Sequence, residues 1–294
     1  MLPGLKIGHA HCAAARTGVT VLVPDVPVVM AVDVRGGGPG TRETDALDAA
    51  NLVERVHGLV LAGGSVFGLD AASELALLLA RDGVGLAVAG GVSVPVVPAA
   101  ILFDLANGGD KGWAQAGGAE PPYRRLARDA YAGRSENPAQ GRVGAGFGAM
   151  AGSRPGGIGM ARARLDGGGA VAALVAVNCF GEVVSGEPPL GGPVPMPKLA
   201  TRPRQTGGNT CIGAVATDVP LNRAAARRLA MMAQDGLARA IRPIHTPFDG
   251  DSIFAIGLAP ETPPEVDPVL LAELGTRAAD CVALAVREAV LSAA

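Results

Sequence analysis

Short apolar runs and longer segments of helical spacing alternate along this chain. The short runs, rich in β-branched residues, predict strands at residues 19–23, 28–32, 58–62, 142–150, 157–165, 171–177, 182–184, 210–216 and 252–256. Apolar positions three and four apart predict helices at residues 44–56, 69–80, 123–131, 221–240 and 268–292. Strands fall in groups of two or three between the helices, and 182–184 follows closely enough to pair with 171–177. This pattern indicates a layered α/β or α+β domain in which helices cover sheets.

The composition is that of a globular chain with an aliphatic core. Of 294 residues, 49% are hydrophobic but only 3% are aromatic, so Val, Leu, Ile and Ala must fill the interior. With a formal net charge of -2, the chain lacks the excess of basic residues that is typical of nucleic-acid-binding proteins. Residues 186–208 hold many Pro, Gly and basic residues with little periodicity, and we expect an exposed linker there.

Cysteine and histidine usage argues against a metal site. The four histidines include no HExxH pair, and no CxxC spacing occurs among the four cysteines, Cys12, Cys179, Cys211 and Cys281. No unbroken stretch of about 20 apolar residues predicts a membrane span, and no secretory signal opens the chain. We therefore expect a cytoplasmic protein with free thiols, no cofactor and no membrane partner.

Two loop motifs have both a structural and a functional interpretation. Residues 63–65, Gly-Gly-Ser, join a predicted strand to a predicted helix. They lack the lysine of a P-loop and do not match GxGxxG, so a tight connection is favoured over a nucleotide cradle. Asp249 and Asp251 stand two apart before a strand, so their carboxylates can share one face. Such a pair can perform acid–base chemistry or hold an amine, and it can equally be a solvated turn.

Polar side chains at the tips of two apolar strands are the remaining candidates. Asn178 ends the run 171–177, where its amide is either a turn former or a donor aimed at a developing oxyanion. Residues 207–218 read GGNTCIGAVATD, so a threonine and a cysteine open a strand directly after Gly-Gly-Asn. That order is either an ordinary loop-to-strand junction or a site of internal cleavage.

Internal cleavage would use the hydroxyl of Thr210. The hydroxyl attacks the Asn209 carbonyl in an N-to-O acyl shift, and the glycines permit the strained backbone that the shift needs. Hydrolysis of the ester frees the α-amine of Thr210, whose reference pKa is about 7.7–8.0. Such an amine is a base poised near neutral pH to activate its own hydroxyl as a nucleophile.

Several segments together carry a family resemblance. In chain order they are RGG (35–37), PGTRETD (39–45), LAGGS (61–65), FGLDAA (67–72), VGAG (143–146), VN (177–178), GGNTCIGAVATD (207–218) and FDGDSIFA (248–255). With them the sequence resembles the DmpA-like family of self-cleaving aminopeptidases and amidases. This family includes the β-peptidyl aminopeptidases and the endo-type nylon-oligomer hydrolase. The likeness covers nearly the whole chain.

The resemblance implies a fold and an assembly. The fold would be α+β, a four-layer αββα sandwich similar to the N-terminal-nucleophile hydrolases. Residues 1–294 would form a single hydrolase domain that cleaves itself into 1–209 and 210–294. Members of the family are homo-oligomers, commonly tetramers, and need no metal or organic cofactor.

The resemblance also implies roles for individual residues. Thr210 matches the nucleophile, and the cleaved bond joins it to Asn209. Asn178 matches the asparagine that donates to the oxyanion, and Asp249 and Asp251 match the acidic pair that orients the Thr210 amine and hydroxyl. The implied substrate is a peptide, an amino-acid amide or a linear amide oligomer with a free amine.

The sequence departs from the family pattern at two places. Phe103 stands where some members have a tyrosine, so a second oxyanion donor of that kind is missing. Relatives often carry a lysine after the position of Gly146. Here Arg154 is the nearby cation in 147–155, and an arginine cannot act as a base. Cys211, beside the predicted nucleophile, is expected to be a small buried hydrophobe.

Two alternatives to a self-processing amide hydrolase stay open at this point. One is an acyltransferase of the ornithine-acetyltransferase type, which also splits before a threonine but has different residues ahead of it. The other is an uncleaved, catalytically silent relative that acts as a binding protein. An amine acceptor followed by mass spectrometry separates transfer from hydrolysis, and a denaturing gel separates cleaved from uncleaved protein.

Overall fold

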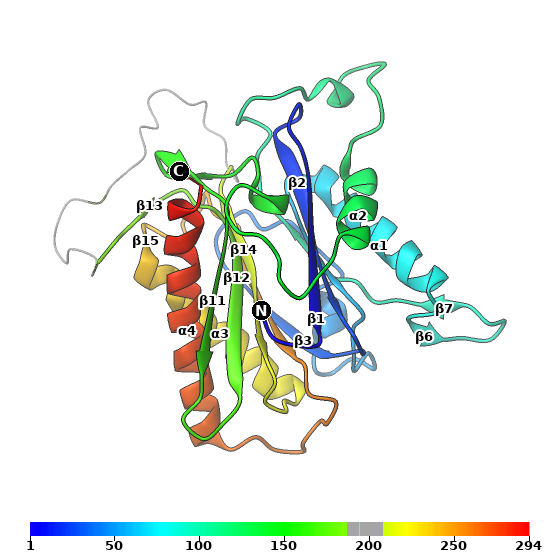
Figure 1. Ribbon diagram of the computed structural model, residues 1–294, viewed down its shortest axis with the longest axis vertical. Helices are drawn as coiled ribbons and strands as arrows, with labels where there is room; N and C mark the ends of the chain where they lie inside the picture. Colours follow the sequence, from blue (N-terminus) through cyan, green and yellow to red (C-terminus); the bar gives the residue numbers. More distant parts are fainter. Residues whose placement is uncertain (187–193, 195–207, 294) are drawn as a thin grey trace.

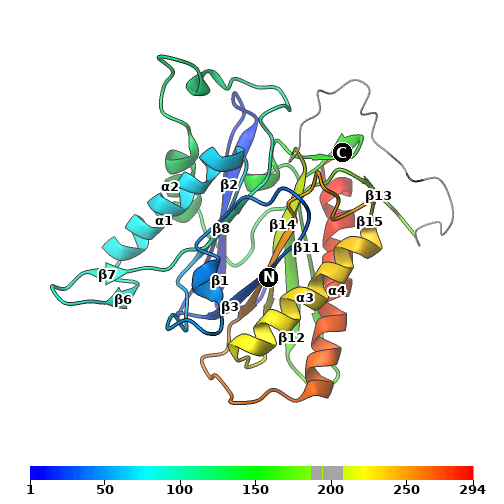
Figure 2. The same ribbon diagram turned by 180° about the vertical axis from the view of Figure 1, so that it is seen from behind.

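The computed structural model describes residues 1–186, 194 and 208–293. Two five-stranded sheets pack face to face, and a pair of helices covers the outer face of each (Figures 1 and 2). The predicted αββα sandwich is therefore confirmed. The linker predicted at 186–208 falls, apart from residues 186, 194 and 208, outside the described residues.

The first sheet comes from the N-terminal part of the chain, in the order β1-β2-β5-β8-β4. Only β5 and β8 run parallel, because the helical connection between them returns the chain to the same edge. The helices of that connection and of the following segment, α1 and α2, cover the outer face. The bounds are β1 Leu5–Cys12, β2 Thr17–Pro24, β4 Thr41–Arg42, β5 Leu59–Ala62, β8 Ala99–Ile101, α1 Asp70–Arg81 and α2 Tyr123–Ala132.

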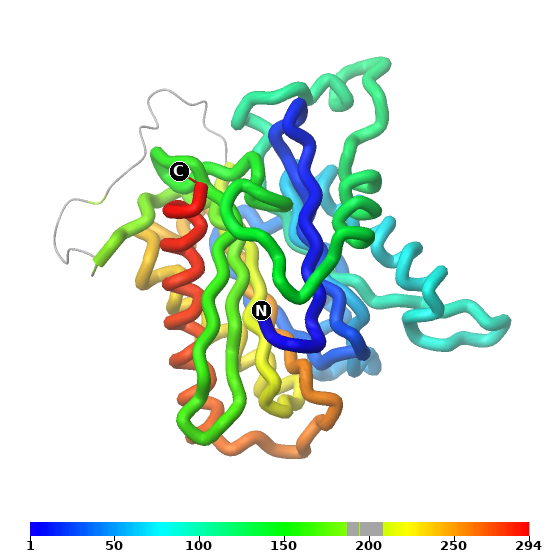
Figure 3. Tube along the Cα trace, viewed as in Figure 1, coloured from blue at the N-terminus to red at the C-terminus, as the bar shows by residue number. Residues whose placement is uncertain are grey.

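The second sheet has the order β11-β12-β14-β16-β3, with β14 and β16 parallel. Its edge strand β3 brings an N-terminal segment into a sheet whose other strands all come from the second half of the chain (Figure 3). Helices α3 and α4 cover its outer face. The bounds are β3 Val29–Val34, β11 Ile158–Arg164, β12 Ala170–Asn178, β14 Thr210–Thr217, β16 Ser252–Gly257, α3 Arg223–Ala240 and α4 Pro268–Leu291.

Strand alternation sorts the side chains into separate apolar layers. In β12, Val175 and Val177 pack under α3 and α4, while Leu174 and Ala176 face the first sheet. In β14, Cys211 packs on the helix side and Ile212 on the sheet side. The layer between the sheets also holds Leu22, Leu59, Leu61, Met30 and Phe254. Burial on both faces explains why these strands read as continuous apolar runs.

Small elements complete the fold. The short strands are β6 Leu86–Ala87, β7 Ser93–Val94, β9 Met150–Ala151, β10 Arg154–Pro155, β13 Glu182–Val183 and β15 Ile241–Arg242. The 3-10 turns are η1 Asp45–Leu47, η2 Ser65–Leu69, η3 Gly112–Ala114 and η4 Gly144–Gly146. The predicted partner of 182–184 is wrong: β13 pairs with β15, and the strand at 171–177 is already paired on both sides by β11 and β14.

The helix predicted at 44–56 is also wrong, since only η1 forms there. Asp48 accepts a hydrogen bond from the Ala50 N–H at 2.8 Å, and the Asn51 amide donates to the Asp45 carbonyl at 2.6 Å. Such local side-chain bonds compete with helical backbone bonds and hold the segment as turns. Two of its apolar positions, Leu47 and Val56, are still buried, whereas Leu52 is exposed.

The strand predicted at 142–150 is a third error, because η4 occupies its centre. Gly144 has a φ of 50°, and a Cβ there would lie 2.3 Å from the Thr20 Oγ1. The Ala145 N–H donates to that same oxygen at 3.0 Å. The segment therefore packs across β2 through its backbone, which only a glycine-rich sequence allows. Strand β1, by contrast, was not predicted, since its apolar alternation stops at His9.

Candidate active site

The two polar strand tips that the sequence singled out are brought together. Asn178, the last residue of β12, and Thr210, the first of β14, are direct partners in the antiparallel register. Both share a strand face with the apolar layer between the sheets, and both are 1% exposed. The Thr210 hydroxyl donates a hydrogen bond to the carbonyl oxygen of Asn209. The buried Thr210 hydroxyl therefore contacts the carbonyl of the peptide bond that joins Asn209 to Thr210.

The amide of Asn178 is held by two loops. Its Oδ1 accepts from the Met150 N–H at 2.9 Å, and its Nδ2 donates to the Phe103 carbonyl at 3.0 Å. These contacts fix which end of the amide is the donor. Since Nδ2 carries two hydrogens, the bond to Phe103 leaves one N–H for another acceptor beside Thr210.

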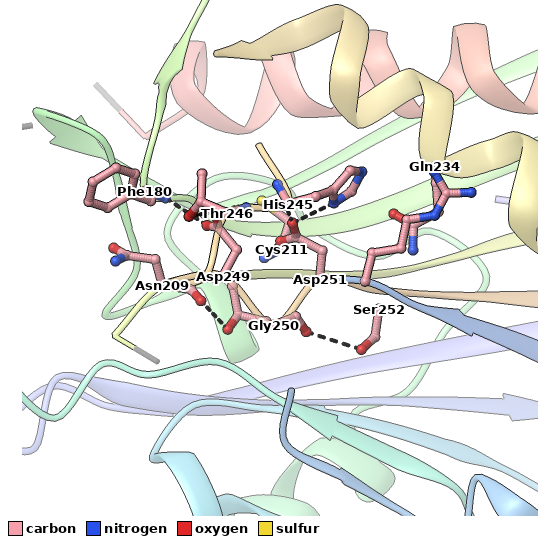
Figure 4. Close-up of polar contacts among 12 residues, drawn as sticks. Phe180, Asn209, Cys211, Gln234, His245, Thr246, Asp249, Gly250, Asp251 and Ser252 are labelled. Carbon is pink, nitrogen blue, oxygen red and sulfur yellow. Dashed lines mark hydrogen bonds and ion pairs between the residues drawn. The ribbon is translucent and has the colours of Figure 1, made fainter. Parts of the chain in front are cut away.

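The acidic pair lies on the turn before β16, close to Cys211 and Phe180, which follow the two strand tips (Figure 4). The Asp251 Oδ1 accepts from the Cys211 N–H at 2.7 Å, directly after Thr210. The Asp249 Oδ1 accepts from the Phe180 N–H at 3.1 Å, two residues after Asn178. Both carboxylates are fully buried, which rules out a solvated turn. Burial and the neighbouring charge of Asp251 raise the pKa of Asp249.

The glycine-rich segment at 35–38 closes over this acidic turn. The Arg35 N–H donates to the Asp251 carbonyl at 2.7 Å, and the Gly38 N–H donates to the Asp249 carbonyl at 2.9 Å. Gly36 has a φ of 89°, and a Cβ there would lie 2.4 Å from the Asp249 carbonyl oxygen. Glycine is required here because the backbone itself forms the contact.

Cys211 faces away from the Thr210 side chain. It packs in the layer under α3 and α4, and it is fully buried. Burial, with Cys179 beside it, raises the pKa of its thiol well above the usual range. The thiol therefore stays neutral, and the structure supports the prediction that Cys211 is a small buried apolar side chain.

The backbone N–H groups of the Gly-Gly-Ser loop at 63–65 all donate hydrogen bonds to other groups of the same chain. The Gly63 N–H donates to the Gly18 carbonyl at 2.9 Å and the Ser65 N–H to the Leu102 carbonyl at 3.0 Å. The Gly64 N–H donates to the Asp104 carboxylate at 2.8 Å. With these donors engaged, the loop is the tight strand-to-helix connection that the sequence favoured over a phosphate cradle.

Asp104 is a buried carboxyl group that the sequence did not single out. It follows Phe103, whose carbonyl holds the Asn178 amide, and it is fully buried. Its Oδ1 accepts from the Gly64 N–H, whereas its Oδ2 is buried without a hydrogen-bond partner among residues 1–186, 194 and 208–293. Burial raises the pKa of Asp104 from 3.8 to about 6, even though the nearby Thr17 and Lys111 oppose the shift.

We expect Asp104→Asn to change how stability depends on pH. Because the folded-state pKa is raised, the folded protein binds this proton more tightly, so wild type loses stability as pH rises from about 4 to about 6. A shift of about two pKa units corresponds to about 3 kcal/mol. Asn keeps an acceptor for the Gly64 N–H and does not titrate. The variant should therefore gain about 3 kcal/mol relative to wild type between pH 4 and pH 7, measured by urea unfolding. A difference that does not change with pH would contradict this.

Several contact groups at the site were not predicted from the sequence. They are the Phe103 carbonyl, the Met150 N–H, and the His245 and Thr246 donors that hold the acidic pair. The only sequence signal was a run of polar residues, His245 and Thr246, just ahead of Asp249. Arg154, considered as a substitute for the lysine of relatives, is exposed on β10.

No group of three or more His, Cys, Asp or Glu side chains suited to a metal ion occurs within residues 1–186, 194 and 208–293. In the same residues no helix is long and apolar enough to cross a membrane.

A solved structure shares the fold of this chain. The L-aminopeptidase D-Ala-esterase/amidase of Ochrobactrum anthropi, described as a variant of the Ntn hydrolase fold, superimposes with a TM-score of 0.76. The match covers 99% of this chain and 85% of that one at 21% sequence identity. The chain therefore has this variant of the Ntn hydrolase fold.

Sequence comparison identifies the family. Residues 2–294 match the model of peptidase family S58, and the chain belongs to this family. An uncharacterized aminopeptidase of Mycobacterium tuberculosis (strain ATCC 25618 / H37Rv) is 41% identical over 99% of this chain and 92% of its own length. The 6-aminohexanoate-oligomer endohydrolase of Paenarthrobacter ureafaciens is 30% identical over 86% of this chain and 73% of its own length. The resemblance seen in the sequence is confirmed.

Proposed function

We propose that this protein is a self-processing amide-bond hydrolase whose nucleophile is an N-terminal threonine, Thr210. The observation that carries the proposal is the buried Thr210 hydroxyl, which lies against the Asn209 carbonyl and beside the Asn178 amide. A nucleophile, its target and an oxyanion donor are thus adjacent before any substrate binds.

Self-processing begins when the Thr210 Oγ1 bonds to the carbonyl carbon of Asn209. The Asn178 N–H that is not given to Phe103 donates to the oxyanion that forms. The C–N bond then breaks, the Thr210 nitrogen takes the hydroxyl proton, and an ester joins the two residues. Water hydrolyses the ester, which leaves a carboxylate on Asn209 and a free amine and hydroxyl on Thr210.

The freed amine then serves as the base in substrate hydrolysis. It takes the proton from the Thr210 hydroxyl as the oxygen attacks the substrate carbonyl, and Asn178 again donates to the oxyanion. The protonated amine gives its proton to the leaving amine of the substrate. Water, activated by the same amine, releases the acid product and restores the hydroxyl.

The two pieces, 1–209 and 210–294, would remain in one fold. Strand β14 begins at the proposed cleavage site and lies between β12 from the first piece and β16 from the second. Its ladder with β12 runs the full length from Asn178↔Thr210 to Val171↔Thr217. We further propose a cytoplasmic homo-oligomer, tetrameric by family resemblance.

The proposed substrate class is an amide or peptide with a free amine. The relatives support this: one is an aminopeptidase and another an oligomer endohydrolase by name. D- and β-amino-acid amides and linear amide oligomers belong to the same chemical class. An acyltransferase activity is tested by adding an amine acceptor and looking for its acylated product by mass spectrometry.

A denaturing gel of purified wild-type protein tests self-processing directly. Two bands, with the smaller one beginning Thr-Cys-Ile-Gly, support the proposal. One band after long incubation supports an uncleaved binding protein instead. Release of p-nitroaniline from amino-acid p-nitroanilides then tests hydrolysis by the processed protein.

We expect Asp251→Asn to shift the pH dependence of the processed enzyme. Negative charge close to the Thr210 amine favours its protonated form, but the base must be neutral to work. Wild-type kcat/KM should rise with pH through a limb at or above about 7.7–8.0. Removing one charge should move that limb to lower pH. The amide NH2 would also face the His245 donors, so orientation and kcat should fall.

The measurement is kcat/KM against pH on a p-nitroanilide for processed wild type and Asp251→Asn. Asp235→Asn is the matched control, because it removes an exposed carboxylate from α3. An unchanged limb with full activity in Asp251→Asn would remove the acidic pair from the chemistry.

A further inference from the structure

Two consecutive residues, His245 and Thr246, hold the two buried carboxylates, one each (Figure 4). His245 donates to the Asp251 Oδ2 from its backbone N–H at 3.2 Å, and its ring Nδ1 lies 2.8 Å from the same oxygen. Thr246 donates to the Asp249 Oδ2 through its backbone N–H at 2.9 Å and its hydroxyl at 2.5 Å. Each residue therefore uses both its backbone and its side chain on a single carboxylate oxygen.

The backbone at this place is bent to make the double contact possible. His245 has a φ of 55°, a left-handed conformation that is uncommon for residues other than Gly, although Asn, Asp and His adopt it more often than other side chains. Such a residue lets successive N–H groups point toward anions on one side of the chain. Strained conformations of this kind persist where the surroundings hold them, and here those surroundings are the two carboxylates.

The opposite oxygens of the same carboxylates reach the two strand tips. The Asp251 Oδ1 holds the N–H of Cys211, next to Thr210, and the Asp249 Oδ1 holds the N–H of Phe180, two residues past Asn178. Each carboxylate is thus a bridge between the 245–246 segment and one strand end. Since both carboxylates are fully buried, every hydrogen bond they receive matters to where they sit.

We propose that His245 and Thr246 are positioning residues that set the place of Thr210 relative to Asn178 through the two carboxylates. This inference rests on the proposed function, because it concerns the geometry of the same nucleophile and oxyanion donor. His245 acts on Thr210 through Asp251 and Cys211, and Thr246 acts on the Asn178 end through Asp249 and Phe180. Neither residue has to touch the substrate.

Matched pairs of variants test the two side chains. His245→Ala removes the ring donor, whereas His245→Asn puts an amide NH2 at the place of Nδ1 and tolerates the left-handed backbone. Thr246→Val removes the hydroxyl at nearly constant shape, and Thr246→Ser keeps it. The rate of self-cleavage is followed by gel after cell-free synthesis, and kcat and KM are measured on a p-nitroanilide once processing is complete.

We expect His245→Ala and Thr246→Val to slow self-cleavage and lower kcat by about 10- to 100-fold, because small misplacements of reacting groups have effects of this size. KM should change little. His245→Asn and Thr246→Ser should recover most of the lost rate. Thermal unfolding of each variant in the uncleavable Thr210→Ala background separates this effect from a loss of stability.

Cleavage and kcat at wild-type rates in both His245→Ala and Thr246→Val would overturn the positioning role while leaving the proposed function intact. Equal loss in a donor-keeping variant and its donor-lacking partner would overturn it as well. Wild-type protein that remains one chain would instead contradict the proposed function itself. Should His245→Ala fail to fold, the Thr246→Val and Thr246→Ser pair decides the question.

Discussion

Thr210→Ala should remain a single chain of 294 residues with no hydrolase activity. The methyl side chain has no oxygen to attack the Asn209 carbonyl, so neither the ester nor the free amine can form. The fold should be retained, because Thr210 is the first residue of β14 and its hydroxyl bonds, among the described residues, to the neighbouring Asn209 carbonyl. A denaturing gel and a p-nitroanilide assay measure both effects.

Two control variants sharpen this prediction. Thr210→Ser keeps the hydroxyl and should still yield two fragments. Cys211→Ala should also be processed, since its thiol packs on the opposite face of the strand and is held neutral by burial. Cleavage of Thr210→Ala, or a small fragment with a different first residue, would place the nucleophile elsewhere.

Asn178→Ala should lower kcat by about 10²–10³-fold, the usual effect of losing one oxyanion donor. The structure adds a second consequence, because the amide also bonds the Met150 N–H and the Phe103 carbonyl. Leaving these two partly buried groups without partners should cost about 1 kcal/mol of unfolding free energy. Enzyme kinetics on fully processed protein and urea unfolding measure the two effects separately.

Asn107→Ala is a matched control for Asn178→Ala. The Asn107 amide donates to the Gly148 carbonyl at 2.6 Å, in the loop just before Met150. Its removal should therefore perturb the same loop without taking a donor from the Thr210 side. Near wild-type turnover in Asn178→Ala would return that residue to a purely structural role, and an equal loss in Asn107→Ala would attribute the effect to the loop.

Regular secondary structure was predictable where one physical signal dominated. The run 171–177 lies within β12 and 210–216 within β14, because strands buried on both faces must be apolar throughout. The helices at 69–80 and 268–292 were found within a residue or so of α1 and α4. Prediction was wrong at 44–56, where local side-chain bonds replaced helical hydrogen bonds, and at 142–150, where the backbone bonds to Thr20 of β2 instead of forming a strand.

The residues of the candidate site also fall into two groups, those that the sequence predicted and those that only the structure revealed. Thr210, Asn178, Asp249 and Asp251 were named from the sequence, and their roles stay proposals. Their neighbourhood was not visible there, since His245 and Thr246 carry no periodic signal and Asp104 sits in an otherwise irregular segment. A buried carboxylate looks like an exposed one in a sequence until its surroundings are known.

The sequence by itself determined part of the local order of this protein: the strands and helices with a dominant apolar pattern, and that Thr210 and Cys211 point to opposite faces of one strand. Alternation and apolar spacing encode these features because they depend only on near neighbours in the chain. The tertiary structure alone decided that Asn178 lies opposite Thr210 and that the acidic turn reaches both strand ends. Strand register and the burial of charge depend on the packing of distant segments, and a residue's own neighbours do not specify that packing.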